Sequence, residues 1–215
     1  MSARVLGEST QALQKSLARL SSGSKLNNAS DDAAGAAVSL KLDSQISRLN
    51  AAKSNVGNAI SFSQTQDGYL KKVGTALDRM GELAVLAQDT TKSSTDLALY
   101  DKEFQKLATF IDDTASKKFN DVGLFSATGI KVTQDEDGTA YTMSAVNLGA
   151  AGGKYKLATA TDVTDTTKAA AALTAVKNAV TQLASDRADV GADQSVLQNI
   201  SSTMSVLKDN LGAAN

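Results

Sequence analysis

The chain has 215 residues, enough to bury a hydrophobic core, and its 22 basic and 23 acidic residues almost balance. It contains no His and no Cys, which excludes a Ser-His-Asp triad, a Cys-His pair, an ordinary zinc site and any disulfide. It also lacks Pro, so long helices can run without interruption, and its balanced charge gives no basic stripe for nucleic acid.

The first 40 residues predict one helix, a polar turn and the start of a second helix. Leucines three and four residues apart predict a first helix over residues 5–20. The segment "SSGSKLNNAS" then interrupts the pattern. Ser30 is the predicted N-cap of the next helix, and the carboxylates of Asp31 and Asp32 face the positive end of its dipole. This position favours a capping role for the two aspartates over a pair of catalytic carboxylates.

The second predicted helix extends over residues 31–88, roughly 85 Å at about 1.5 Å per residue. Apolar residues recur along it at alternating spacings of three and four, from Leu42 to Ala84. Four glycines lie inside this pattern without disturbing it: Gly57, Gly68, Gly74 and Gly81. We expect neighbouring helices to approach closely at these four positions.

A third helix is predicted over residues 95–116, and four apolar residues follow it: Phe119, Val122, Leu124 and Phe125. We expect this apolar segment to seal one end of the core. Alternation around Asp137-Gly138 predicts a β-hairpin, and a further short strand is predicted over residues 155–158. The last predicted helix covers residues 167–211.

Together these elements predict a mainly α fold, an elongated antiparallel bundle of long helices with a small β-hairpin region. We divide it into residues 1–125, the N-terminal helices of a rod domain, and residues 167–215, the C-terminal long helix of the same domain. Residues 126–166, hereafter the connector, carry the hairpin.

Few residues in this chain have the spacing of a reactive or ligand-binding site. Asp135, Glu136 and Asp137 lack the further ligands of a calcium loop and indicate a solvated turn. The segment "GAAGG" at 149–153 lacks the spacing and the Lys of a phosphate-binding loop. We therefore expect no catalytic residue, no cofactor and no metal.

The strongest signal is the segment "LQKSLARLSSGSKLNNASDDAAGAAV" (13–38), where RLSSG ends one predicted helix and DDAAG begins the next. This segment resembles bacterial flagellins, in which one helix ends in RLSSG and the next begins with DDAAG. The resemblance continues through 49–70, 77–89 and 110–125 and, more loosely, through "ASDRADVGADQSVL" (184–197). Matches at five ordered sites across most of the chain are specific.

The resemblance implies a structural filament subunit that serves motility and is not an enzyme. Its implied partners are other flagellin subunits and the flagellar export chaperone and cap proteins. The N-terminus has no apolar signal-peptide core, so the resemblance further implies export to the flagellum without a cleaved signal peptide. Compared with the family the chain is shorter at both ends, and we expect it to be monomeric in solution.

Flagellins recognised by Toll-like receptor 5 present an Arg, a Leu four residues later and a Glu on the next helix. By this resemblance the receptor contacts are Arg79 and Leu83 in "LDRMGELAV" and Glu103 in "YDKEFQKL". The helix pattern alone would instead make Arg79 a solvated charge and place Leu83 in the core, continuing from Leu77 and Met80.

Two other functions fit the helical pattern. A hook–filament junction protein shares the rod architecture, but that family tends to have Pro after the paired Asp, where this chain has Ala33. A cytoplasmic helical adaptor would also fit. Enzymatic flagellins with a metalloprotease insert need His-Glu-x-x-His, which a chain without His cannot supply.

Overall fold

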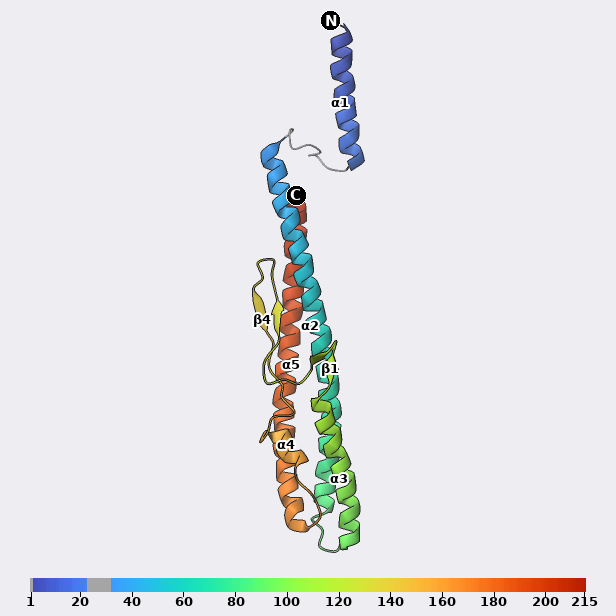
Figure 1. Ribbon diagram of the computed structural model, residues 1–215, viewed down its shortest axis with the longest axis vertical. Helices are drawn as coiled ribbons and strands as arrows, with labels where there is room; N and C mark the ends of the chain where they lie inside the picture. Colours follow the sequence, from blue (N-terminus) through green and yellow to red (C-terminus); the bar gives the residue numbers. More distant parts are fainter. Residues whose placement is uncertain (1, 23–31) are drawn as a thin grey trace. The chain divides into compact units, whose positions relative to one another are not determined.

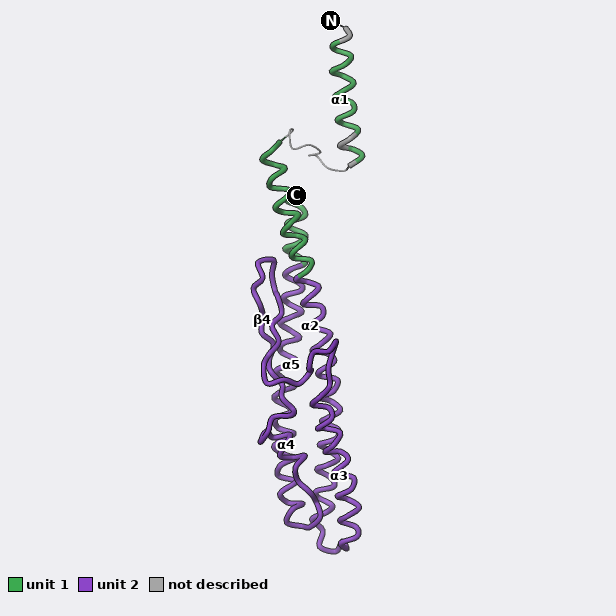
Figure 2. Tube along the Cα trace, in the orientation of Figure 1, with its two compact units in different colours: residues 1–51, 205–215 green, residues 52–204 purple. Residues whose placement is uncertain are grey.

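The computed structural model describes residues 2–22 and 32–215 and divides into two compact units (Figure 2). Unit 1 comprises residues 1–51 and 205–215, and unit 2 comprises residues 52–204. Two long helices, α2 (Ala33–Leu86) and α5 (Thr166–Ala214), contribute residues to both units (Figure 1). The mainly α fold class predicted from the sequence, with long helices and a small β-hairpin region, is confirmed.

The long helices begin and end within three residues of the predicted boundaries. Besides α2 and α5, the long helices are α1 (Ser2–Ser22) and α3 (Ser94–Ala115). A capping box fixes the start of α3: the Asp96 amide donates to Ser93 Oγ at 3.2 Å, and the Ser93 amide donates to Asp96 Oδ2 at 3.0 Å. These two bonds satisfy amides that a helix start otherwise leaves without partners.

Two antiparallel strand pairs lie between α3 and α5 in the sequence. The predicted hairpin is confirmed as β3 (Lys131–Thr133) paired with β4 (Ala140–Thr142), with Val132 opposite Tyr141. A shorter pair, β1 (Lys118–Phe119) with β2 (Val122–Gly123), was not predicted. Its two-residue turn places Asn120 and Asp121 at positive φ, 47° and 62°, as a type I′ hairpin turn requires.

The strand predicted at residues 155–158 is wrong, because this segment forms the short helix α4 (Lys154–Thr159). Tyr155, Ala158 and Thr159 are its buried residues, three and four apart, and this is helical spacing. Gly152, at φ 72°, turns the chain into the helix start. Four residues are too few for periodicity to separate a strand from one helical turn.

In unit 2, α2 and α5 run antiparallel and pair along a seam of buried residues. On α2 the seam positions alternate at spacings of three and four, as in coiled coils. They are Ala52, Val56, Ala59, Ser63, Gln66, Leu70, Val73, Leu77, Met80 and Ala84. The direction follows from contacts between the helices: Ser63 Oγ donates to the Val190 carbonyl at 3.5 Å, and Arg187 Nε lies 2.9 Å from Asp67 Oδ1.

Two of the four glycines of α2 lie where α5 comes close. A Cβ at Gly74 would lie 3.1 Å from Leu183 Cδ2, and one at Gly81 would lie 3.7 Å from Val176 Cγ1. At Gly57 and Gly68 a Cβ would meet nothing within 4 Å. The predicted close approach is therefore confirmed at Gly74 and at Gly81 and is wrong at the other two.

The apolar segment that follows α3 packs on the side of α2. The ring of Phe119 meets that of Phe62 edge-on at 5.9 Å, and Gln66 Nε2 donates to the Leu124 carbonyl at 2.7 Å. Leu124 and Phe125 are buried, whereas Val122 is 50% exposed. Because α2 continues past this contact in both directions, the segment covers the helix where α3 ends and does not seal an end of α2.

Candidate functional site

The start of α2 was predicted to be capped by Ser30, Asp31 and Asp32. Ser30 and Asp31 lie outside the described residues. Asp32 directly precedes the helix, and its Oδ1 accepts a hydrogen bond of 2.9 Å from the Gly35 amide. Its carbonyl accepts a second bond, of 3.0 Å, from the Ala36 amide. This is the geometry of an N-cap, and it gives the Asp32 carboxylate a structural role.

Two of the three predicted receptor contacts, Arg79 on α2 and Glu103 on α3, lie side by side. Arg79 Nε donates to Glu103 Oε1 at 2.7 Å and its second terminal nitrogen donates to Oε2 at 3.1 Å. The first terminal nitrogen of Arg79 donates to Glu82 Oε2 at 2.8 Å. These bonds, first that to Glu103 and then that to Glu82, raise the pKa of Arg79, and the Arg79 bond lowers the pKa of Glu103. The result is a fixed, solvent-facing charge cluster.

Leu83, the third predicted contact, does not join this cluster. Its side chain is 1% exposed, and its neighbours Met80 and Ala84 belong to the α2 seam. At this level α2 is covered on two sides, by α5 near Gly81 and by α3 through the Arg79–Glu103 pair. Leu83 is therefore a core residue of this folded chain, and its burial argues against the predicted contact with a receptor.

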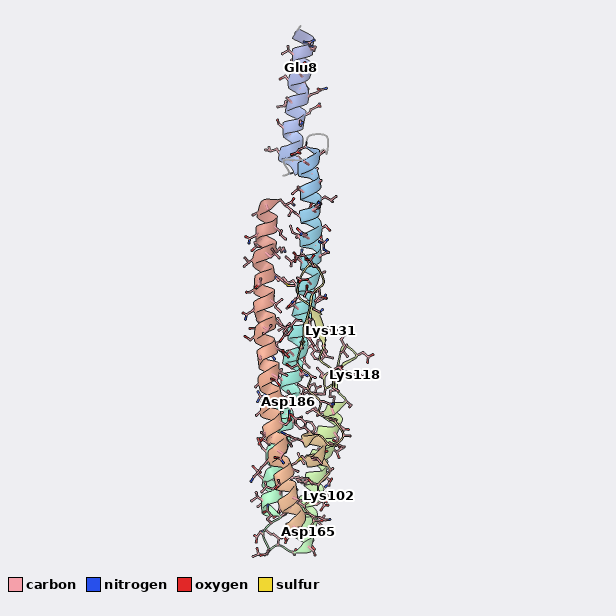
Figure 3. All side chains as sticks on the ribbon, turned by 90° about the vertical axis from the view of Figure 1, so that its left-hand side faces the viewer. Glu8, Lys102, Lys118, Lys131, Asp165 and Asp186 are labelled. Carbon is pink, nitrogen blue, oxygen red and sulfur yellow. The ribbon has the colours of Figure 1, made fainter. Side chains whose placement is uncertain are left out.

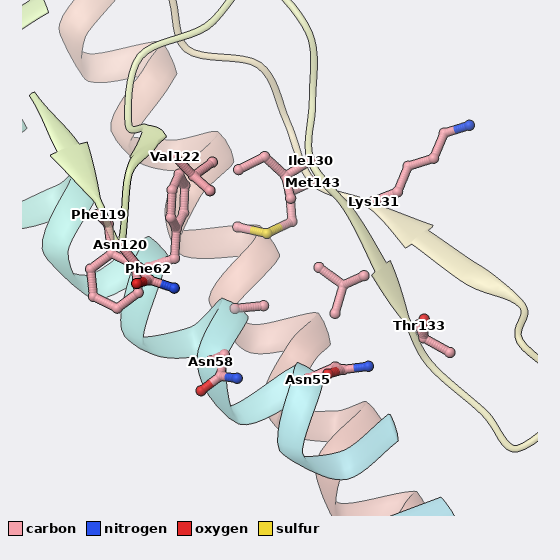
Figure 4. A pocket seen from close by; sticks show the side chains of 12 residues that line it. Asn55, Asn58, Phe62, Phe119, Asn120, Val122, Ile130, Lys131, Thr133 and Met143 are labelled. Carbon is pink, nitrogen blue, oxygen red and sulfur yellow. The ribbon is translucent and has the colours of Figure 1, made fainter. Parts of the chain in front are cut away.

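A groove that the sequence did not predict lies in unit 2 between α2 and the two strand pairs (Figure 4). Its volume is about 530 Å³. Seven apolar side chains line it: Ala59, Phe62, Phe119, Val122, Ile130, Val132 and Met143. Asn55 and Asn58 of α2 add amide groups to the lining. These residues come from four separate segments, so no local pattern in the sequence marks the groove.

In the acidic turn of the hairpin, the side chain of Asp135 binds backbone amides of the same turn. Asp135 Oδ1 accepts hydrogen bonds from the amides of Asp137, at 3.1 Å, and of Thr139, at 2.8 Å. Its hydrogen bonds, the one to Thr139 first, lower the pKa of Asp135.

Among residues 2–22 and 32–215, no group of three or more carboxylates is placed to hold a metal ion. In the same ranges no helix is both long and apolar enough to cross a membrane.

A family model and individual relatives of known identity both match this chain, and they point to the same family. Residues 2–130 match the family described as the bacterial flagellin N-terminal helical region. The flagellar filament 30.7 kDa core protein of Treponema maltophilum is 31% identical over 227 residues, which cover 98% of this chain and 80% of that protein. Most of each chain therefore takes part in the match.

Two solved structures are similar to this chain. Bacillus cereus flagellin aligns with a TM-score of 0.60 and 25% identity, over 76% of this chain and 95% of that one. A putative flagellar hook-associated protein from Vibrio parahaemolyticus aligns with a TM-score of 0.74 over 87% of this chain and 98% of that one. At 14% identity the second likeness shows the fold alone.

Proposed function

Because this chain belongs to the bacterial flagellin family and is a structural subunit of the flagellar filament, we propose that it works by packing against copies of itself and not by catalysis. Helical packing surfaces repeated along a polymer add many weak contacts into a stable assembly. The described residues supply such surfaces. Charged side chains among them have structural partners: Asp32 caps α2, Asp135 binds the hairpin turn, and Arg79 pairs with Glu103.

The observation that carries this proposal is the exposed apolar stripe of α1. Its members are Val5, Leu6, Leu13, Leu17 and Leu20, each more than half exposed. A lone helix of 21 residues is marginally stable in water, and burying each leucine contributes about 1.5–3 kcal/mol. The stripe therefore favours contact with a neighbouring subunit.

The test replaces the natural gene by one encoding Leu13→Ser and measures filament length by electron microscopy. Gln11→Ser, on the opposite face of α1, is the matched control. We expect short or absent filaments for Leu13→Ser and normal filaments for Gln11→Ser. Normal filaments from a protein with both Leu13→Ser and Leu6→Ser would contradict a packing role for α1.

We also infer that the family's other partners and export route apply to this chain. These are the flagellar export chaperone, the cap proteins and passage to the cell exterior without a cleaved signal peptide. Mass spectrometry of protein from sheared filaments should find the N-terminal segment intact, and a protein that has lost a leader would contradict the inference.

For Toll-like receptor 5 we propose a contact through Arg79 and Glu103, without Leu83. The side chains of Arg79 and Glu103 are 44% and 45% exposed, and an Arg held by a neighbouring carboxylate offers a preorganised contact. Binding of the receptor ectodomain should fall for Arg79→Ala. Arg187→Ala is the matched control, because Arg187 also forms an exposed ion pair, with Asp67. Equal binding by both variants would rule out the contact.

A further inference from the structure

Two aspartates occupy core positions in the seam of α5. From Ala169 to Leu197, the buried residues of this helix alternate at spacings of three and four. They are Ala169, Ala172, Val176, Ala179, Leu183, Asp186, Val190, Asp193 and Leu197. Asp186, marked on α5 in Figure 3, is 7% exposed, and Asp193 is 4% exposed. Seven residues apart, they hold the same position in successive heptads.

Each aspartate is bound by a tyrosine from the connector. Tyr155 Oη donates to Asp186 Oδ2 at 2.6 Å, and Tyr141 Oη donates to Asp193 Oδ1. The other oxygens also have donors: Gln182 Nε2 donates to Asp186 Oδ1 at 2.8 Å, and the Ser144 amide donates to Asp193 Oδ2 at 2.7 Å. Tyr155 belongs to α4 and Tyr141 to β4, so the two bonds hold two different parts of the connector.

The facing stretch of α2 is polar as well. Ser63 and Gln66 are buried seam residues at 0% and 4% exposure. Ser63 donates to the carbonyl of Val190, which lies between the two aspartates. Gln66 donates to the Leu124 carbonyl, just before the connector begins. Polar seam residues thus gather where the connector and the segment before it meet the helices.

The aspartates are unfavourable for helix pairing by itself. A buried carboxylate costs free energy unless it is hydrogen-bonded, whereas leucine at the same position would extend the apolar seam. The seam is apolar on both sides of this stretch, with Val176 and Leu183 on one side and Leu197 and Met204 on the other. Pairing of α2 with α5 therefore does not require the connector, but docking of the connector uses both aspartates.

We propose that Asp186 and Asp193 are docking residues that hold the connector on α5 through Tyr155 and Tyr141, and that loss of these bonds releases it as one segment while the helices stay paired. Release has a direct consequence for the groove. Ile130, Val132 and Met143 belong to its connector side, so the groove keeps this wall only while the connector is docked.

The test is hydrogen exchange of the Asp186→Leu/Asp193→Leu variant, followed by mass spectrometry. We expect amides in β4 and α4 to exchange roughly tenfold faster, the change that follows from losing a hydrogen bond to a charged group. Amides of α2 and α5 within unit 2 should keep their protection, and the melting temperature should stay level or rise. Asp189→Leu, an exposed aspartate on the same helix, is the matched control and should leave all rates unchanged.

The Tyr141→Phe/Tyr155→Phe variant supplies the second measurement. It keeps both rings but leaves two buried carboxylates short of a donor, so the connector should again exchange faster and here the melting temperature should fall. Connector rates like those of the unchanged protein in the leucine variant would overturn the proposal. Equal acceleration of connector and helices would overturn it too. If the leucine variant does not fold, unchanged connector rates in the phenylalanine variant overturn it.

Discussion

Arg79 and Glu103 are joined by two parallel hydrogen bonds, 2.7 Å and 3.1 Å long, across 24 residues of sequence. This bidentate geometry fixes α3 against α2 at one level of unit 2, and Glu82 holds the remaining arginine nitrogen from within α2. Both side chains remain nearly half exposed. The pair can therefore stabilise the fold weakly and still present a rigid charged surface to a partner.

Removing this pair should have a small effect on stability that depends on salt. Exposed ion pairs are screened, so Arg79→Ala should lower the melting temperature slightly in dilute buffer and not at all in molar salt. Lys102→Ala removes one exposed positive charge from α3 and is the control. Thermal unfolding followed by circular dichroism measures both, and a large fall that persists in salt would mean that Arg79 has a buried role.

Leu83 should behave as a core residue. Truncating a leucine that is 1% exposed removes buried contacts and leaves a cavity, so Leu83→Ala should lower the free energy of unfolding by about 2–5 kcal/mol. Leu99 is 63% exposed, and Leu99→Ala should change the free energy of unfolding by less than about 0.5 kcal/mol. Urea unfolding gives both values. Similar values for the two variants would contradict the burial of Leu83.

The protein should lose stability in alkali through its docked tyrosines. Burial first, and then the bond to Asp193, raise the pKa of Tyr141 to about 12, and burial with the Asp186 bond raises that of Tyr155. Their unfolded value is 10.0, so the folded state holds protons that the unfolded state releases. The tyrosine contribution is complete below about pH 10 and falls as pH rises towards 12 and above.

The measurement is urea unfolding at several pH values above 9. The Tyr141→Phe/Tyr155→Phe variant should show a shallower fall in the free energy of unfolding over this range, because its two titrating groups are gone. Identical slopes for the variant and the unchanged protein would exclude the two tyrosines as the cause.

The start of α2 should depend on the side chain of Asp32. Asp32→Ala removes the acceptor for the Gly35 amide and should reduce the local stability of the first turn by about 0.5–2 kcal/mol. Asp32→Asn keeps an acceptor oxygen at this position and should reduce the local stability of the first turn less than Asp32→Ala does. Amide exchange at Gly35 and Ala36 reports the effect, and equal rates in both variants would show that the cap contributes nothing.

The sequence predicted the elements whose pattern repeats over many residues. Apolar spacing of three and four marked the long helices, and Asp137-Gly138 marked the β3–β4 hairpin. The same evidence failed for residues 155–158, where one helical turn is shorter than the pattern needs. Asn120-Asp121 followed by Val122 was a signal that could have indicated the β1–β2 turn, since Asn and Asp tolerate positive φ.

The features of the surface and of the polar seam could not be predicted, because their partners are distant in the chain. Tyr141 lies 52 residues from Asp193 and Tyr155 lies 31 from Asp186, so neither bond leaves a local trace. Local periodicity predicted that Leu83 is a core residue, as the structure shows, whereas the family resemblance predicted that it contacts a receptor. Burial depends on which neighbours cover the helix, and α3 and α5 cover this part of α2.

The measurement that tests the central claim most directly is immunogold electron microscopy of cells that carry the natural gene, with antibodies raised against this chain. A filament subunit predicts gold particles along the whole length of each flagellar filament, and loss of both filaments and label when the gene is deleted. Label confined to the junction between hook and filament, or label inside the cell with intact unlabelled filaments, would contradict the account.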